Sequence, residues 1–108
     1  MMKFDIMTIE LRKDEQVLDD RGANLFRGLE GVGGRLKTTN QRLIFEPHLF
    51  NIQKQTLEVP LNQILEVKPR NTWGIVPNGV LIKMISGQEY KLVVWNRKKL
   101  IELINKIK

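Results

Sequence analysis

The stretch GRLKTTNQRLIFEP, residues 34–47, decides the fold of this chain of 108 residues. Apolar and polar side chains alternate on both sides of Asn40-Gln41, as expected for two β-strands that each bury one face. Asparagine tolerates the left-handed backbone conformation that tight hairpin turns require. The stretch therefore predicts a β-hairpin, with one strand over Arg35–Thr39 and the next over Arg42–Glu46.

Short apolar runs like these recur with turn signals between them from Glu15 onward, which is typical of a small β-barrel or sandwich. The glycine-rich stretch GLEGVGGR (residues 28–35) is expected to form a flexible loop between two strands. Residues 1–14 are expected to be an N-terminal extension or an added edge strand before a domain of residues 15–108. The remaining strands are expected over Val17–Asp19, Asn24–Leu29, Thr56–Val59, Ile64–Pro69, Gly79–Ile85 and Glu89–Val94.

The last two of these strands form a second hairpin whose register follows from its apolar face. Tyr90, Leu92 and Val94 share one face, so the residues opposite them should be apolar too. This requirement favours an odd-length loop with Gly87 as its positive-φ residue. The expected pairs are Met84–Tyr90, Ile82–Leu92 and Val80–Val94.

The period of the apolar residues changes after Trp95. Leu100, Leu103, Ile104 and Ile107 recur at three- and four-residue spacing, which predicts an amphipathic helix over about residues 96–107 with Asn96 as its N-cap. The apolar stripe of this helix needs a partner, and the open end of a barrel would provide one. The expected fold is mainly β, a barrel closed by one C-terminal helix.

The net charge of the chain is +6, and this charge is unevenly distributed. Residues 1–30 carry five Lys or Arg against seven Asp or Glu, whereas residues 31–108 carry thirteen against five. A basic body indicates an anionic partner, such as phospholipid headgroups, nucleic acid or an acidic protein surface. Basic charge that serves only solubility remains the alternative. Nucleic acid ranks below lipid and protein, because the few aromatic residues mostly follow core-like alternation.

The residues that enzymes need are absent or scattered. The sequence has no cysteine and one histidine, His48, in a turn-like setting beside Pro47. No phosphate-binding glycine motif and no converging set of metal ligands is present. We therefore expect no catalytic residue, no metal and no cofactor. The lack of a signal-peptide core or a long apolar run predicts a soluble, cytoplasmic protein, for which any membrane contact would be peripheral.

Three segments resemble GRAM domains in the expected order. GRLKTTNQRLIFEP (34–47) is similar to the family's central hairpin, VPLNQILEV (59–67) to the segment after it, and GVLIKMISGQEYKLVVWNRKKLIELI (79–104) to its last hairpin and helix. The resemblance implies a pleckstrin-homology-like fold, a bent barrel of about seven strands closed by a C-terminal helix. It also implies a module that binds membranes, phosphoinositides or proteins. Thr38 stands where the family usually has an aliphatic residue, and Lys37 where an aromatic residue is common.

Four cations are candidates for contact with a lipid headgroup. Arg35 and Lys37 alternate on one strand and should share its outer face, although such residues also occur on any solvated strand. Arg27 ends the preceding strand, and the glycines between would let the loop fold around a ligand. The full expected set is Arg27, Arg35, Lys37 and Arg42. A secondary basic patch is expected at Arg97, Lys98 and Lys99, where the helix dipole disfavours cations.

The loop NTWGIVPNGV, residues 71–80, combines turn-forming residues with Trp73, Ile75 and Val76. These apolar side chains either fold back over the barrel end, the interpretation that we favour, or project outward as a contact tip. The sequence thus predicts a non-catalytic module that contacts anionic phospholipid or phosphoinositide, with this loop as an apolar anchor. The alternative is a module that uses the same loop to bind another protein or a second copy of itself.

Overall fold

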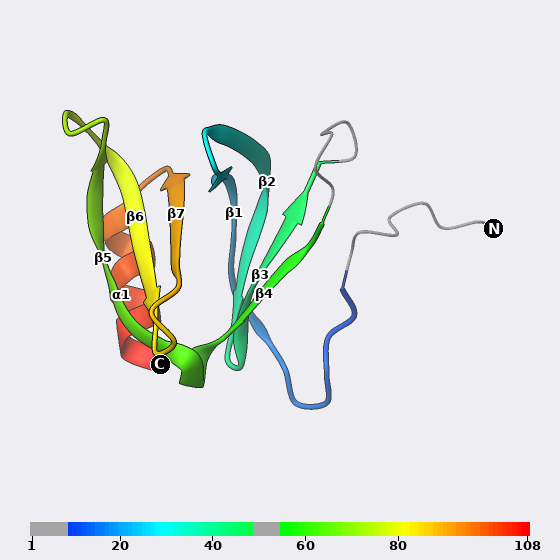
Figure 1. Cartoon of the computed structure of the whole chain (residues 1–108). Coiled ribbons are helices and arrows are strands. Elements are labelled where there is room, and N and C mark those ends of the chain that lie inside the picture. The colour runs from blue at the N-terminus through cyan, green and yellow to red at the C-terminus, as the bar shows by residue number, and fades with distance from the viewer. Residues whose placement is uncertain (1–8, 49–54) are drawn as a thin grey trace.

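The computed structural model describes residues 9–48 and 55–108. Seven antiparallel strands form one sheet in the order β4-β3-β2-β1-β7-β6-β5, and this sheet bends into a half-barrel (Figure 1). Helix α1 (Arg97–Ile107) follows the last strand, and a short 3-10 helix (Leu61–Gln63) joins β4 to β5. The strands are β1 Val17–Arg27, β2 Glu30–Thr39, β3 Arg42–Pro47, β4 Leu57–Pro60, β5 Ile64–Thr72, β6 Val76–Met84 and β7 Glu89–Val94. The pleckstrin-homology-like fold is confirmed.

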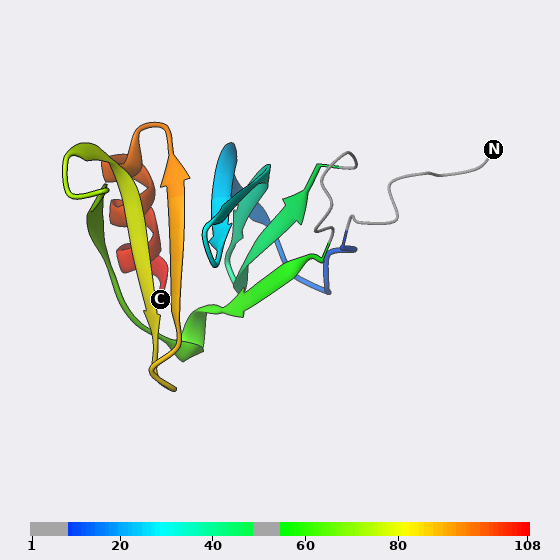
Figure 2. The same cartoon turned by 45° about the horizontal axis from the view of Figure 1, so that its top comes forward.

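Helix α1 closes the half-barrel on the side of β5, β6 and β7 (Figure 2). Leu100 and Ile104, from its predicted apolar stripe, are fully buried among inward-facing residues of the sheet. The helix begins one residue after Asn96, as predicted. However, Asn96 adopts a left-handed conformation with φ 54° and its side chain makes no cap. Its carbonyl and that of Trp95 instead accept hydrogen bonds from Arg21 Nη1, at 3.0 and 2.8 Å.

The central hairpin lies where the sequence predicted it, but its turn has another cause. Asn40 does not adopt the left-handed conformation. The Thr39 hydroxyl instead accepts hydrogen bonds from the backbone N–H groups of Gln41 and Arg42, each at 3.0 Å. The predicted glycine-rich loop is wrong, because β2 already begins at Glu30. Gly34 belongs to this strand, and a Cβ there would come within 2.4 Å of the Glu46 carbonyl oxygen.

The register of the last hairpin differs from the prediction by two residues. Ile82 pairs with Tyr90 and Val80 with Leu92, so the predicted pairs are wrong although the apolar faces still match. The loop has an odd length and Gly87 has φ 95°, as expected. The Met84 N–H donates to the Gln88 carbonyl at 2.8 Å, which starts the loop one residue earlier than predicted.

Residues 9–16, which we call the strap, cross the outer face of β3 without forming a strand. The Ile9 N–H donates to Glu46 at 2.9 Å, and Gln41 Nε2 donates to the Lys13 carbonyl at 3.2 Å. The predicted edge strand is therefore not present in the strap, and residues 1–8 lie outside the described residues.

Candidate functional site

Two turns from distant parts of the sequence border one hollow on the surface. The β1–β2 turn contributes Gly28 and Leu29, and the end of the β5–β6 hairpin contributes Arg70 and Trp73. The hollow has a volume of about 220 Å³ and is lined by Phe26, Gly28, Leu29, Arg70, Thr72, Trp73 and Lys91. We call Leu29, Trp73, Ile75, Arg70 and Lys91 together the rim.

The β5–β6 turn, which projects at the upper left of Figure 1, has an unusual backbone. Trp73 and Gly74 have φ values of 53° and 76°, and the Ile75 N–H donates to the Thr72 carbonyl at 3.2 Å. Two successive positive φ values are typical of a type I′ hairpin turn, which favours Asn-Gly. A tryptophan in the left-handed region costs about 1–2 kcal/mol. The fold tolerates this cost and holds the indole at the tip.

The apolar side chains of the rim are almost completely exposed. Leu29 is 103% exposed, Trp73 83% and Ile75 78%, whereas Val76, which begins β6, is only 39% exposed. The interpretation that the loop folds back over the barrel end is therefore wrong, because Trp73 projects outward. Leu29 was not among the predicted contacts, because the sequence pattern places it at the end of a strand over Asn24–Leu29. β1 instead ends at Arg27, and Gly28, with φ 66°, turns the chain.

Two cations adjoin the apolar side chains. Arg70 is half-buried and Lys91 is exposed, and both line the hollow. Neither side chain forms an ion pair within the described part of the chain. No sequence pattern marks these two residues, because their position beside Leu29 and Trp73 depends on the tertiary fold.

Two of the predicted headgroup contacts, Arg35 and Lys37, lie on the outer face of β2 as expected from alternation. Each already has an anionic partner. Arg35 Nε lies 3.0 Å from the Asp20 carboxylate, and Lys37 Nζ lies 2.8 Å from that of Glu46. Neither residue lines the hollow of the rim, so the structure does not bring these cations together with the apolar tips.

The other two predicted contacts, Arg42 and Arg27, form hydrogen bonds within the fold. Arg42 is 2% exposed because the strap lies over it, and its guanidinium contacts Glu15 at 2.8 Å and also Glu58. The hydrogen bonds between the two side chains lower the pKa of Glu15 to about 2 and raise the pKa of Arg42. This burial removes Arg42 from any surface site. Arg27 is half-buried and donates to the main-chain carbonyl of Gln55.

The predicted basic patch at the helix start separates into two parts. Arg97 Nη1 donates to the carbonyls of Arg70 and Gly79, at 3.0 and 3.2 Å, and so links α1 to the hairpin that carries the rim. Lys98 and Lys99 are exposed. Arg97 is thus a structural cation, and only the two lysines are available at the surface.

Comparisons with known proteins agree with the fold. The model of the GRAM domain family matches residues 2–105. The crystal structure of the C-terminal domain of an unknown protein from Leishmania infantum superposes with a TM-score of 0.74 at 16% identity, covering 85% of this chain and 83% of that one. The Vps36 N-terminal PH domain superposes with a TM-score of 0.67 at 16% identity, covering 91% and 85%.

A curated relative, UDP-sugar-dependent glycosyltransferase 52 of Dictyostelium discoideum, is 30% identical over 81 residues. This match covers 75% of the present chain but only 5% of the glycosyltransferase. No helix in residues 9–48 and 55–108 is long and apolar enough to cross a membrane. GRAM and PH-like domains are in general modules that bind membranes, lipids or proteins rather than catalysts. The match over nearly the whole length, together with the fold, shows that the chain belongs to the GRAM domain family.

Proposed function

We propose that this chain is a non-catalytic module that docks on anionic lipid headgroups at a membrane surface through the rim. One observation carries the proposal: three large apolar side chains on two neighbouring turns are at least 78% exposed, beside two cations that have no ionic partner among residues 9–48 and 55–108. Exposed apolar side chains next to cations are the combination that interfacial membrane binding uses. In this docking geometry the apolar tips enter the interface and the cations meet the headgroups.

The expected strength of this contact is modest. Burial of a Leu, Ile or larger side chain contributes about 1.5–3 kcal/mol, and a cation near an anionic leaflet about 1 kcal/mol. The loss of translational and rotational freedom offsets much of this gain. We therefore expect weak, reversible binding that falls as salt increases and as the anionic lipid content decreases. Arg35 and Lys37 contribute less than Arg70 and Lys91, because their charges are already paired.

The two ends of β6 offer a matched test. Ile75 and Ile85 are both exposed, at 78% and 59%, and they lie in the turns at opposite ends of this strand. We expect Ile75→Ser and Trp73→Ala to weaken co-sedimentation with phosphatidylcholine vesicles that contain phosphatidylserine. Ile85→Ser should leave it unchanged. A Trp95→Phe background leaves Trp73 as the only tryptophan, and its fluorescence should shift to the blue when vesicles are added.

Binding that ignores phosphatidylserine content and salt would contradict the proposal. So would equal losses for Ile75→Ser and Ile85→Ser. The alternative, self-association through the same side chains, predicts a concentration-dependent dimer in analytical ultracentrifugation without vesicles. That dimer should disappear in Trp73→Ala, and this result would assign the rim to a protein contact instead.

A further inference from the structure

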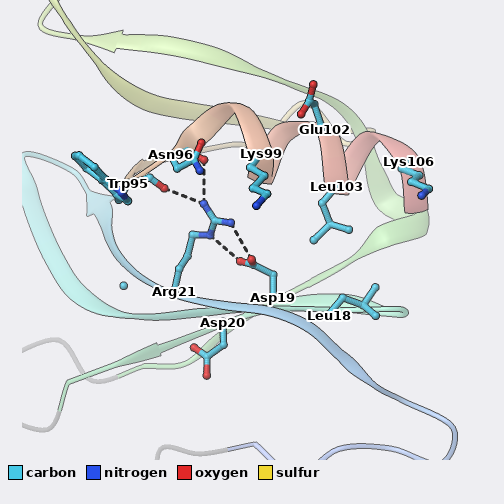
Figure 3. A pocket seen from close by; sticks show the side chains of 11 residues that line it. Leu18, Asp19, Asp20, Arg21, Trp95, Asn96, Lys99, Glu102, Leu103 and Lys106 are labelled. Carbon is cyan, nitrogen blue, oxygen red and sulfur yellow. Dashed lines mark hydrogen bonds and ion pairs between the residues drawn. The ribbon is translucent and has the colours of Figure 1, made fainter.

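A second surface feature, unrelated to the rim, is a groove between the first half of β1 and helix α1 (Figure 3). Its volume is about 840 Å³, and it shares no lining residue with the hollow of the rim. Leu18, Asp19 and Arg21 line it from β1, and Lys99, Leu103 and Lys106 line it from α1. The groove is thus a gap between β1 and α1 on the surface of the half-barrel.

The gap arises because β7 is too short to accompany β1 along its whole length. β1 pairs with β7 only through Ala23, Asn24 and Leu25. After Val94, the partner of Ala23, the chain leaves the sheet and enters α1. Within the described residues, Val17–Gly22 has β2 on one side and no strand on the other. An unpaired strand edge presents backbone N–H and C=O groups that accept an additional strand. Trp95 and Asn96 follow Val94 and lie beside Arg21, whose Nη1 donates to their carbonyls at 2.8 and 3.0 Å. The open segment is therefore Val17–Asp20, which would span about 13 Å in an extended strand.

The charges in the groove favour an anionic occupant. Arg21 neutralises Asp19 through two contacts, at 2.7 and 2.8 Å. Asp20 points away from α1 in Figure 3 and pairs with Arg35 at 3.0 Å.

The helix side of the groove is basic. Glu102 points away from β1, whereas Lys99 points toward it (Figure 3). Lys99 and Lys106 form no ion pair with any described residue, so they are the uncompensated charges at the groove.

Apolar side chains lie between these charges. Leu18 is 43% exposed on β1, and the half-buried Leu103 points from α1 toward β1 (Figure 3). A strand added to β1 would alternate its side chains between two faces. One of these faces would meet Leu103 and the two lysines of the helix.

We propose that the groove binds an extended peptide segment of a partner protein, one in which acidic and aliphatic residues alternate. The segment adds as a strand to the free edge of Val17–Asp20, and its acidic side chains meet Lys99 and Lys106. This interaction is independent of the proposed membrane contact, because the two surfaces have no residue in common.

The test uses a fluorescein-labelled octapeptide in which Asp alternates with Leu or Val between terminal glycines. We expect saturable binding by fluorescence anisotropy, and the double variant Lys99→Glu/Lys106→Glu should weaken it about tenfold or more. The matched control Lys98→Glu/Lys108→Glu makes the same charge change in the first turn of α1 and directly after its last residue, outside the groove, and the affinity of this control should change less than about twofold. The same peptide with N-methylated backbone amides should not bind, because it cannot donate strand hydrogen bonds.

Hydrogen exchange followed by NMR locates the bound peptide. Amides within Val17–Asp20 should gain protection when the peptide binds. No binding at about 1 mM peptide, or equal binding of a version with Lys in place of Asp, would overturn the proposal. Protection at the edge strands β4 or β5 instead would also overturn it. If Lys99→Glu/Lys106→Glu reduces vesicle binding but not peptide binding, the groove is part of the lipid-facing surface and the peptide proposal fails.

Discussion

Replacing Trp73 with asparagine should stabilise the fold and weaken membrane docking at the same time. The native φ of 53° at this position, followed by 76° at Gly74, suits an Asn-Gly pair better than Trp-Gly. Asparagine enters the left-handed region at lower cost than tryptophan, which saves part of about 1–2 kcal/mol. The conformation thus favours the substitution although the side chain becomes much smaller.

The loss of packing limits this gain only slightly. Trp73 is already 83% exposed, so the small remaining contact contributes less than about 1 kcal/mol at about 25 cal/mol per Å². The net expectation for Trp73→Asn is an increase of about 0.5–1 kcal/mol in the free energy of unfolding. For a domain of this size, the gain corresponds to a rise of about 3–5 °C in Tm. Vesicle binding should fall, because the largest apolar tip of the rim is gone.

Urea unfolding followed by circular dichroism measures the first effect, and vesicle co-sedimentation measures the second. Trp95→Asn is the matched control, since Trp95 is 89% exposed but does not have a positive φ. This control should not gain stability. If Trp73→Asn lowers the free energy of unfolding, or changes it no differently from Trp95→Asn, the assignment of a strained backbone to the rim is refuted.

Three further substitutions test the interior of the domain. Thr38→Val should raise the free energy of unfolding in urea by about 1 kcal/mol, because the Thr38 hydroxyl is fully buried and has no hydrogen-bond partner in the described part of the chain. A loss of stability would show that the hydroxyl is satisfied. The Glu15 carboxylate, with its pKa lowered from 4.5 to about 2, contributes stability above pH 4.5 that is lost as the pH falls through about 2. Glu15→Gln should cost about 2–3 kcal/mol at pH 7 and remove this part of the acid transition, whereas Glu30→Gln on the surface should do neither. Arg97→Leu should cost about 1–2 kcal/mol and speed amide exchange at the β5–β6 turn; unchanged exchange would contradict its proposed link to the rim.

The parts of the fold that depend on local pattern could be predicted from the sequence. Alternation located the hairpin around Asn40-Gln41, and the three- and four-residue spacing of Leu100, Leu103 and Ile104 located the helix. The register of the last hairpin could not be fixed, because a slip of two residues keeps every side chain on its face. The backbone hydrogen bond from Met84 to Gln88 belongs to the observed register, and the sequence pattern does not reveal it.

Less of the candidate site than of the fold could be predicted from the sequence. Trp73 was selected because an apolar residue in a turn is unusual, but its exposure depends on what the rest of the chain covers. Arg42 alternates like a surface cation, and only the strap makes it a buried one. Leu29 and Arg70 line the same hollow although they lie about forty residues apart in the sequence. No local sequence pattern indicates that they are neighbours.

The short contact between β1 and β7 also has a consequence for how the chain folds. Every other neighbouring pair of strands in the sheet is consecutive along the chain, so those hairpins can form early and locally. Three residue pairs, from Ala23–Val94 to Leu25–Leu92, join strands from opposite ends of the domain. To form these three pairs, the chain must close a loop of about seventy residues, and this closure costs conformational entropy. We therefore expect the β1–β7 junction to form late in folding and to open first when the domain begins to unfold. Residues 9–60 and 61–108 therefore form a natural pair of fragments for complementation, whose reassembly would report directly on the closure of this junction.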